Sequence, residues 1–177
     1  MAPDRGYAVR AAPRAAETDQ WEHNLPTHEA RLFRAAYALS GSRADAEDLV
    51  QETFTRVLAS RRRPRHAADI RYLMRSLRNT WIDFQRAKAV RPAPAAADAV
   101  DWVVDGSADP QTALDVRAAY DAMHDLSPPL REAIAAVDVA GLSYKEAARA
   151  LRIRQGTLMS RLSRARDRVA DALEGAA

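Results

Sequence analysis

The chain contains no cysteine, which excludes a disulfide framework and a thiolate metal site within it. Its four histidines are scattered, without an HExxH or similar spacing, so we expect no metal or other cofactor. No apolar run approaches the ~18 residues that a membrane span needs, and the N-terminus lacks the hydrophobic segment of a signal peptide. These absences predict a cytoplasmic protein without membrane insertion.

Aromatic residues are also scarce, at 6% of the 177 residues, while alanine, leucine and arginine recur throughout. That mixture favours helices over sheet. Hydrophobic residues make up 47% of the chain and charged residues 29%, which is enough apolar material for a packed core. The sequence therefore predicts an all-α protein of one medium domain or two small ones.

The charge is unevenly distributed along the chain. Residues 56–91 carry eleven Lys or Arg against two Asp, and residues 149–168 carry seven Arg against one Asp. Between these blocks, residues 92–116 carry five Asp and no basic residue. Two basic blocks separated by an acidic strip indicate two sites for a polyanion, although two solvated helical faces would give the same pattern.

Helical periodicity and helix-breaking residues divide the chain into segments. Residues 1–23 show no periodicity and are expected to form a disordered arm. Helices are predicted to begin after Thr27, after Ser42 and near Asp69, and these form a first domain over residues 24–91. The Pro/Ala/Asp-rich stretch 92–111 is expected to be an acidic flexible linker. Four further helices, near residues 111–125, 131–139, 144–151 and 155–173, form a second domain over residues 112–177.

The last two of these predicted helices indicate a DNA-binding unit. A full capping box, Ser143 to Glu146, opens the shorter helix, and a three-residue turn leads into a longer basic one. This is the layout of a helix-turn-helix, whose second helix normally enters the major groove. Its apolar residues share one stripe and must face the core, which leaves small polar residues and arginines outside. A surface helix in a bundle is the alternative.

Three segments together resemble the extracytoplasmic-function, or group IV, RNA polymerase sigma factors of the sigma-70 family. Residues 141–148 with 156–166 are similar to region 4 of that family, residues 45–54 to region 2.2, and residues 77–83 to regions 2.3 and 2.4. The resemblance covers about residues 28–173, with both halves in the right order. It implies a transcription initiation factor, not an enzyme, that binds core polymerase through the β′ clamp helices and the β flap.

The resemblance also implies which side chains make contact. Core polymerase would be bound by acidic and amide side chains of the second helix: Asp45, Glu47, Asp48, Gln51 and Glu52. The promoter −10 element would be bound by the arginine-rich loop and the third helix: Arg61, Arg62, Arg63, Arg65, Arg75, Arg78, Asn79, Asp83 and Arg86. The −35 element would be bound by the last helix: Gln155, Thr157, Met159, Ser160, Arg161, Ser163, Arg164, Arg166 and Arg168.

Some alternatives stay open at this point. Trp81 is suited either to stacking on unpaired bases or to the core, since it lies in register with Leu77 and Phe84. The acidic linker either occupies a basic groove of the polymerase or acts as a plain tether. A helix-turn-helix regulator that works without polymerase would explain residues 141–173 but not the first domain. The resemblance further implies regulation by an anti-sigma protein, of a branch whose anti-sigma proteins contain zinc.

Overall fold

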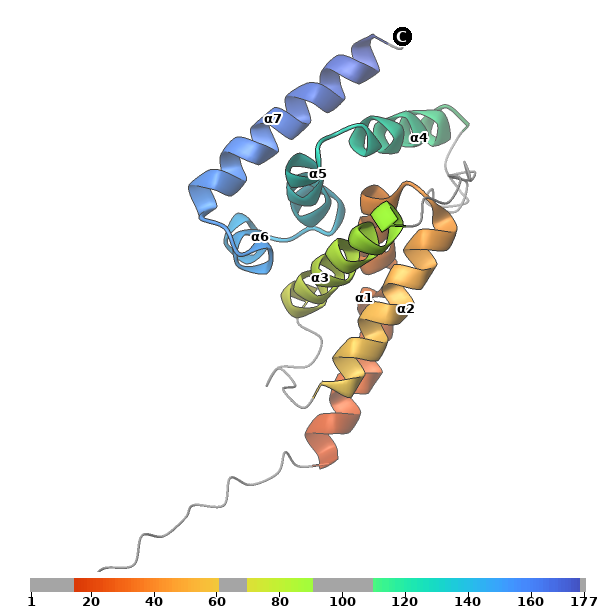
Figure 1. The fold of residues 1–177 in the computed structure, drawn as a ribbon, viewed down its shortest axis with the longest axis vertical. Helices are drawn as coiled ribbons and strands as arrows, with labels where there is room; N and C mark the ends of the chain where they lie inside the picture. Colours follow the sequence, from red (N-terminus) through yellow and green to blue (C-terminus); the bar gives the residue numbers. More distant parts are fainter. Residues whose placement is uncertain (1–14, 61–69, 91–109, 176–177) are drawn as a thin grey trace, which may run out of the picture.

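The computed structural model describes residues 15–60, 70–90 and 110–175, and every element in these ranges is helical. The predicted all-α class is therefore confirmed for the described part. The helices, shown in Figure 1, are α1 (Ala15–Ser40), α2 (Arg43–Ala59), α3 (Ile70–Val90), α4 (Pro110–His124), α5 (Pro128–Ile134), the π-helical turn η1 (Ala135–Val139), α6 (Tyr144–Leu151) and α7 (Gln155–Glu174). None of them combines the length and the apolarity that a membrane span requires.

The first helix begins earlier than the sequence predicts. It starts at Ala15, so Thr27 lies inside α1 and is not its N-cap. The expected disordered arm is therefore wrong for residues 15–23, while residues 1–14 lie outside the described part. Pro26 removes one helical N–H, but residues 15–30 around it contain three Ala and three Glu, which are good helix formers.

In the first half of the chain, α2 packs against both α1 and α3. The Oγ of Ser42 accepts a hydrogen bond from the backbone N–H of Asp45 and caps α2, as the sequence predicts. One face of α2 is buried and comprises Ala46, Leu49, Val50, Thr53 and Val57. Helical spacing predicts Phe54 and Leu58 on the same side, but Phe54 is half-buried and 39% of the Leu58 surface is exposed.

In the second half, α7 lies across α4, α5 and α6 (Figure 1). The helix that was expected to begin at Arg131 begins at Pro128, because proline is well suited to the first helical turn, where its missing N–H has no partner anyway. Helix α5 continues directly into the π-helical turn η1, whose C-cap is Ala140. The capping box is confirmed, since Ser143 and Glu146 each accept a hydrogen bond from the other's backbone N–H.

The two halves pack directly against each other and share one hydrophobic core. A single cluster of buried residues runs from Leu32 in α1 through Leu77 in α3 to Leu158 in α7. Two glycines with positive φ lie at this junction. A methyl group on Gly41 (φ +71°) would overlap the ring of His124, and one on Gly141 (φ +67°) would lie 3.3 Å from the Arg31 guanidinium. The sequence predicted separate domains and gave no sign of this packing; the expected linker lies almost entirely outside the described residues.

Candidate nucleic-acid interface

The helix-turn-helix is formed by α6, the turn Arg152-Ile153-Arg154 and α7. Arg152 takes a left-handed conformation (φ +55°), which lets the chain reverse within three residues. The backbone N–H of Ile153 then donates to the carbonyl of Ala148 over 3.0 Å and closes the end of α6. The turn therefore holds the first residues of α7, from Gln155 to Thr157, at the surface.

One face of α7 is buried and the opposite face is open, as its sequence pattern predicts. Leu158 is buried in the cluster that both halves share, and Leu162, Ala165 and Val169 are buried in a second cluster with residues of the second half. The other side chains predicted to contact DNA lie outside this stripe: Gln155, Thr157, Met159, Ser160, Ser163, Arg164 and Arg168 are exposed, and Arg161 is half-buried. Small polar groups near the start of the helix, with arginines beyond them, suit base readout between phosphates.

Arg166 is engaged within the protein. Its Nε and Nη2 donate to the two carboxylate oxygens of Asp138 in η1, over 2.9 and 2.6 Å. Hydrogen bonds to Asp138 and to Tyr144 raise the pKa of the guanidinium. The pair ties α7 to the π turn and neutralises a cation that the sequence assigned to DNA.

Some of the predicted DNA-binding residues of α3 are exposed, and others are paired within the protein. Arg75, Asn79 and Arg86 are exposed, as a DNA-contacting role requires. Arg78 is 22% exposed in its side chain and donates through Nε to Oε2 of Glu132 in α5, over 2.8 Å. Asp83 accepts from Arg56 of α2 over 2.7 Å, a contact that raises the pKa of Arg56. The loop arginines Arg61, Arg62, Arg63 and Arg65 lie outside the described residues.

Trp81 belongs to the core in this structure. Its side chain is 5% exposed, and its ring stacks on that of Phe84 with 5.8 Å between the centroids. Of the two roles that the sequence left open, burial is the one that the chain adopts here. A stacking role toward bases would require this part of α3 to rearrange.

The second helix carries the residues predicted to bind polymerase. Asp48 and Gln51 are exposed and lie on the side of α2 opposite its buried stripe. Glu47 and Glu52 are also exposed and pair with arginines one turn away, Arg43 and Arg56. Exposed pairs of this kind contribute little to stability, so all four side chains remain accessible to a partner.

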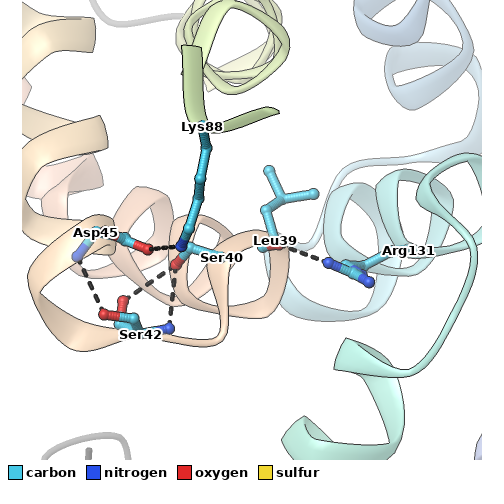
Figure 2. A network of polar contacts seen from close by, with 6 residues as sticks. All are labelled: Leu39, Ser40, Ser42, Asp45, Lys88 and Arg131. Carbon is cyan, nitrogen blue, oxygen red and sulfur yellow. Dashed lines mark hydrogen bonds and ion pairs between the residues drawn. The ribbon is translucent and has the colours of Figure 1, made fainter. Parts of the chain in front are cut away.

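Asp45, also predicted to bind polymerase, has a structural partner. Figure 2 shows Lys88 reaching from the end of α3 to the Asp45 carboxylate, with Nζ–Oδ2 at 3.1 Å. The backbone N–H of Asp45 also donates a hydrogen bond to the hydroxyl of Ser42. Asp45 therefore fixes the start of α2 against α3, and the exposed part of the predicted docking face begins at Glu47.

Sequence reasoning missed several residues that connect the halves. Arg31, Arg131 and Glu132 had no assigned role, yet each makes a polar contact across the junction. Burial of Arg131 lowers the pKa of its guanidinium, which makes hydrogen bonds to three backbone carbonyls. In the sequence, only the position of Glu132 indicates such a contact, because this carboxylate stands beside the apolar residues Leu130, Ala133 and Ile134.

The chain is similar to known proteins over both halves. Residues 26–91 match the family model of Sigma-70 region 2, and residues 117–169 match that of Sigma-70, region 4. It is 33% identical over 160 residues to the ECF RNA polymerase sigma factor SigE of Mycolicibacterium smegmatis, an alignment covering 86% of this chain and 61% of that protein. It is 34% identical over 145 residues to the ECF RNA polymerase sigma factor SigM of Mycobacterium tuberculosis, covering 81% and 71% respectively.

A solved structure matches most of the chain, including both halves. The sigma factor RpoE from Bartonella quintana, crystallised in complex with the anti-sigma factor NepR, superposes with a TM-score of 0.68 and 27% sequence identity. The match covers 89% of this chain and 96% of that one. Because one superposition includes both halves, the likeness extends to their relative placement as well as to each half.

Proposed function

The chain belongs to the extracytoplasmic-function RNA polymerase sigma factors of the sigma-70 family, and from this premise we propose how its helices divide the work of promoter recognition. Sigma factors of this family direct RNA polymerase to promoters and are not enzymes, so binding surfaces carry the function. The observation that supports the proposal most strongly is the open face of α7, which combines small polar residues with exposed arginines.

Region 4 is proposed to read the −35 element through α7. Arg164 is exposed on the face opposite the buried Leu158 and Leu162. A guanidinium in that position can give two parallel hydrogen bonds to guanine O6 and N7, the commonest specific contact in the major groove. Arg168 lies nearer the edge of the face, where phosphates are the partners. Region 4 is also proposed to contact the β flap of polymerase.

Region 2 is proposed to bind and open the −10 element through α3. Arg75 and Arg86 are exposed cations suited to phosphates, and Asn79 offers an amide that can pair with a base edge. Arg78 completes this set once it is released from Glu132. The loop arginines 61–63 and 65, which lie outside the described residues, add four cations to this set in the sequence.

Core polymerase is proposed to dock on α2. Asp48 and Gln51 face outward, with the carboxylates of Glu47 and Glu52 on either side. Leu58, exposed by 39% near the end of the same helix, adds an apolar contact that the sequence did not indicate. An acidic face with an apolar end fits a basic helical hairpin, which is the chemistry expected of the β′ clamp helices.

An anti-sigma protein is the proposed regulator. The similar sigma factor from Bartonella quintana was crystallised with one, and the superposition includes both halves of this chain. The sequence of region 4 further suggests an anti-sigma protein of the zinc-containing class. Polymerase and promoter DNA are cytoplasmic, so the proposed site of action is the bacterial cytoplasm.

Transcription from a promoter template tests the proposed function. Core polymerase with this chain should start at one position, while core polymerase alone should not. DNA binding by the chain without any gain in promoter-directed transcription would instead favour a helix-turn-helix regulator that works without polymerase.

A further inference from the structure

The open face of α7 carries a large apolar side chain, that of Met159, and half of its surface is exposed. Leu158 before it and Leu162 after it are buried in the core, so Met159 lies outside the buried stripe of the helix. Of the described residues of α7, Met159 is the only exposed large apolar one. Contact with an apolar group of a partner would remove this side chain from water, which is favourable.

The surroundings of Met159 are basic. Arg152 in the preceding turn, Arg154 at the start of α7 and Arg164 beyond Met159 are all exposed. Residues 149–168 together carry seven Arg and one Asp. A partner that covers Met159 must therefore also accept this positive charge, which favours DNA over a protein.

The neighbours of Met159 along the helix leave room for a base edge. Gly156 lies three residues earlier, and a methyl group added there would meet nothing within 4 Å. Ser163 lies four residues later and is exposed. Residues three and four apart are neighbours on a helix surface, so Met159 stands between two small residues. Helix α7 itself runs along the outer edge of the second half (Figure 1).

The nearest arginine on the same side of α7 is neutralised within the protein. Arg166 lies seven residues after Met159, close to two helical turns, and donates to both carboxylate oxygens of Asp138 over 2.9 and 2.6 Å. Arg164 and Arg168, on the other side of the open face, are exposed. The open face therefore offers an apolar contact on one side and positive charge on the other.

We propose that Met159 reads a thymine of the −35 element through contact of its side chain with the C5-methyl group. Of the four bases, thymine is the one that presents a methyl group in the major groove. Methionine is flexible and polarizable, so its side chain can follow the position of that group. The inference rests on the proposed function, because it requires α7 to bind the −35 element, and it adds a second reading position beside that of Arg164.

The test uses the holoenzyme, formed by core polymerase and the full chain, on a promoter template selected from a randomised library. Each thymine in either strand of the −35 element is replaced in turn by uracil, which deletes the C5-methyl group and keeps the hydrogen-bonding atoms. Affinity is measured for the unmodified chain, for Met159→Ala and for Leu114→Ala. Leu114→Ala is the matched control, because it shortens another apolar side chain, 61% exposed, in α4 of the same half.

One uracil substitution should lower the affinity of the unmodified chain and of Leu114→Ala about two- to fivefold, the effect of one methyl group losing an apolar contact. Met159→Ala should bind the thymine and uracil forms of that template equally. Met159→Leu, which stays apolar, should keep the preference for thymine, and Met159→Gln, similar in length but polar, should lose it. No uracil-sensitive position in the unmodified chain, or the same sensitivity in Met159→Ala, would overturn the proposal.

Two further outcomes distinguish this inference from its alternatives. If Met159→Ala weakens binding equally on the thymine and uracil templates, Met159 contacts polymerase and not a base, and the proposal is overturned. If the selected templates share no −35 element, the proposed function of α7 fails and the inference fails with it. If Arg164→Ala relaxes a selected −35 element while no uracil substitution has an effect, only the reading of thymine by Met159 is refuted.

Discussion

The ring of Tyr120 in α4 stands edge-on to the ring of Tyr37 in α1, with 5.2 Å between the centroids and 69° between the planes. Tyr120 is 8% exposed, and burial raises the pKa of its phenol to about 12 from an ordinary value of 10.0. An edge-to-face pair of aromatic rings stabilises the fold by more than the burial of its apolar area alone. Since α1 and α4 belong to different halves, this pair makes the junction sensitive to alkaline pH.

We predict that the chain loses stability between pH 10 and 12 through Tyr120. Below pH 10 the phenol is neutral in both the folded and the unfolded state and no penalty arises. Above pH 10 the unfolded phenol ionises first, so the free energy of unfolding falls by about 2–3 kcal/mol up to pH 12. Denaturant titrations at several pH values measure this fall.

The Tyr120→Phe variant should lack that part of the decline, while Tyr144→Phe, which changes a more exposed ring, should retain it. The same decline in Tyr120→Phe as in the unmodified chain would show that Tyr120 is not its source.

A cation introduced on the exposed face of α2 should weaken the binding of core polymerase. Asp48→Arg or Gln51→Arg places a cation on the exposed face that we assign to a basic partner, and neither side chain takes part in packing. A loss of about 1–2 kcal/mol, or roughly five- to thirtyfold in Kd, is expected. Fluorescence titration of core polymerase measures it, with Glu29→Arg as the control on α1. Unchanged affinity with an intact fold would remove the docking face from α2.

Arg164 and Arg168 should behave differently on DNA. Arg164→Ala is expected to cost about 1–3 kcal/mol on the preferred −35 element and to relax base preference at one position. Arg168→Ala should weaken binding on every sequence alike and reduce the salt slope by about one. The full chain is titrated with a cognate and a scrambled duplex at several salt concentrations. If Arg164→Ala lowers both affinities by the same factor, Arg164 contacts phosphate and the reading role passes to Ser160 and Ser163.

Asp138→Asn should increase the affinity of region 4 for DNA of any sequence. The carboxylate of Asp138 neutralises Arg166, and its removal frees that cation for a phosphate. We expect about a three- to tenfold gain on cognate and scrambled duplexes alike, with a salt slope steeper by about one. The double variant with Arg166→Ala should show no gain. A gain that persists in the double variant would show that Arg166 is not the responsible cation.

Local features of the fold were predictable because their causes are local. The Ser42 cap, the Ser143–Glu146 capping box and the buried stripe of α7 each depend on residues within a few turns of one another. The start of α1 was missed because no cap residue marks Ala15 and because Pro26 suggested a boundary. Leu58 was misplaced because periodicity gives the side of a helix but not the edge of the core.

The junction between the halves was not predictable for a different reason. The pair of Arg78 with Glu132 and the bonds of Arg131 to backbone carbonyls join residues far apart in sequence. No periodic or composition signal marks such partners, and the acidic stretch between the halves suggested independence. The family resemblance assigned Arg78 and Arg166 to DNA, whereas the structure gives each a carboxylate partner inside the chain.

Run-off transcription with core polymerase over a randomised promoter library tests whether α3 and α7 of this chain divide promoter recognition between them. Transcripts should appear only when this chain is added, and the selected templates should share a −35 and a −10 element. With Arg164→Ala, selection should weaken at one −35 position and stay intact at −10. Transcription without any selected sequence, or loss of selection at −10 in that variant, would contradict the division of promoter recognition between α3 and α7.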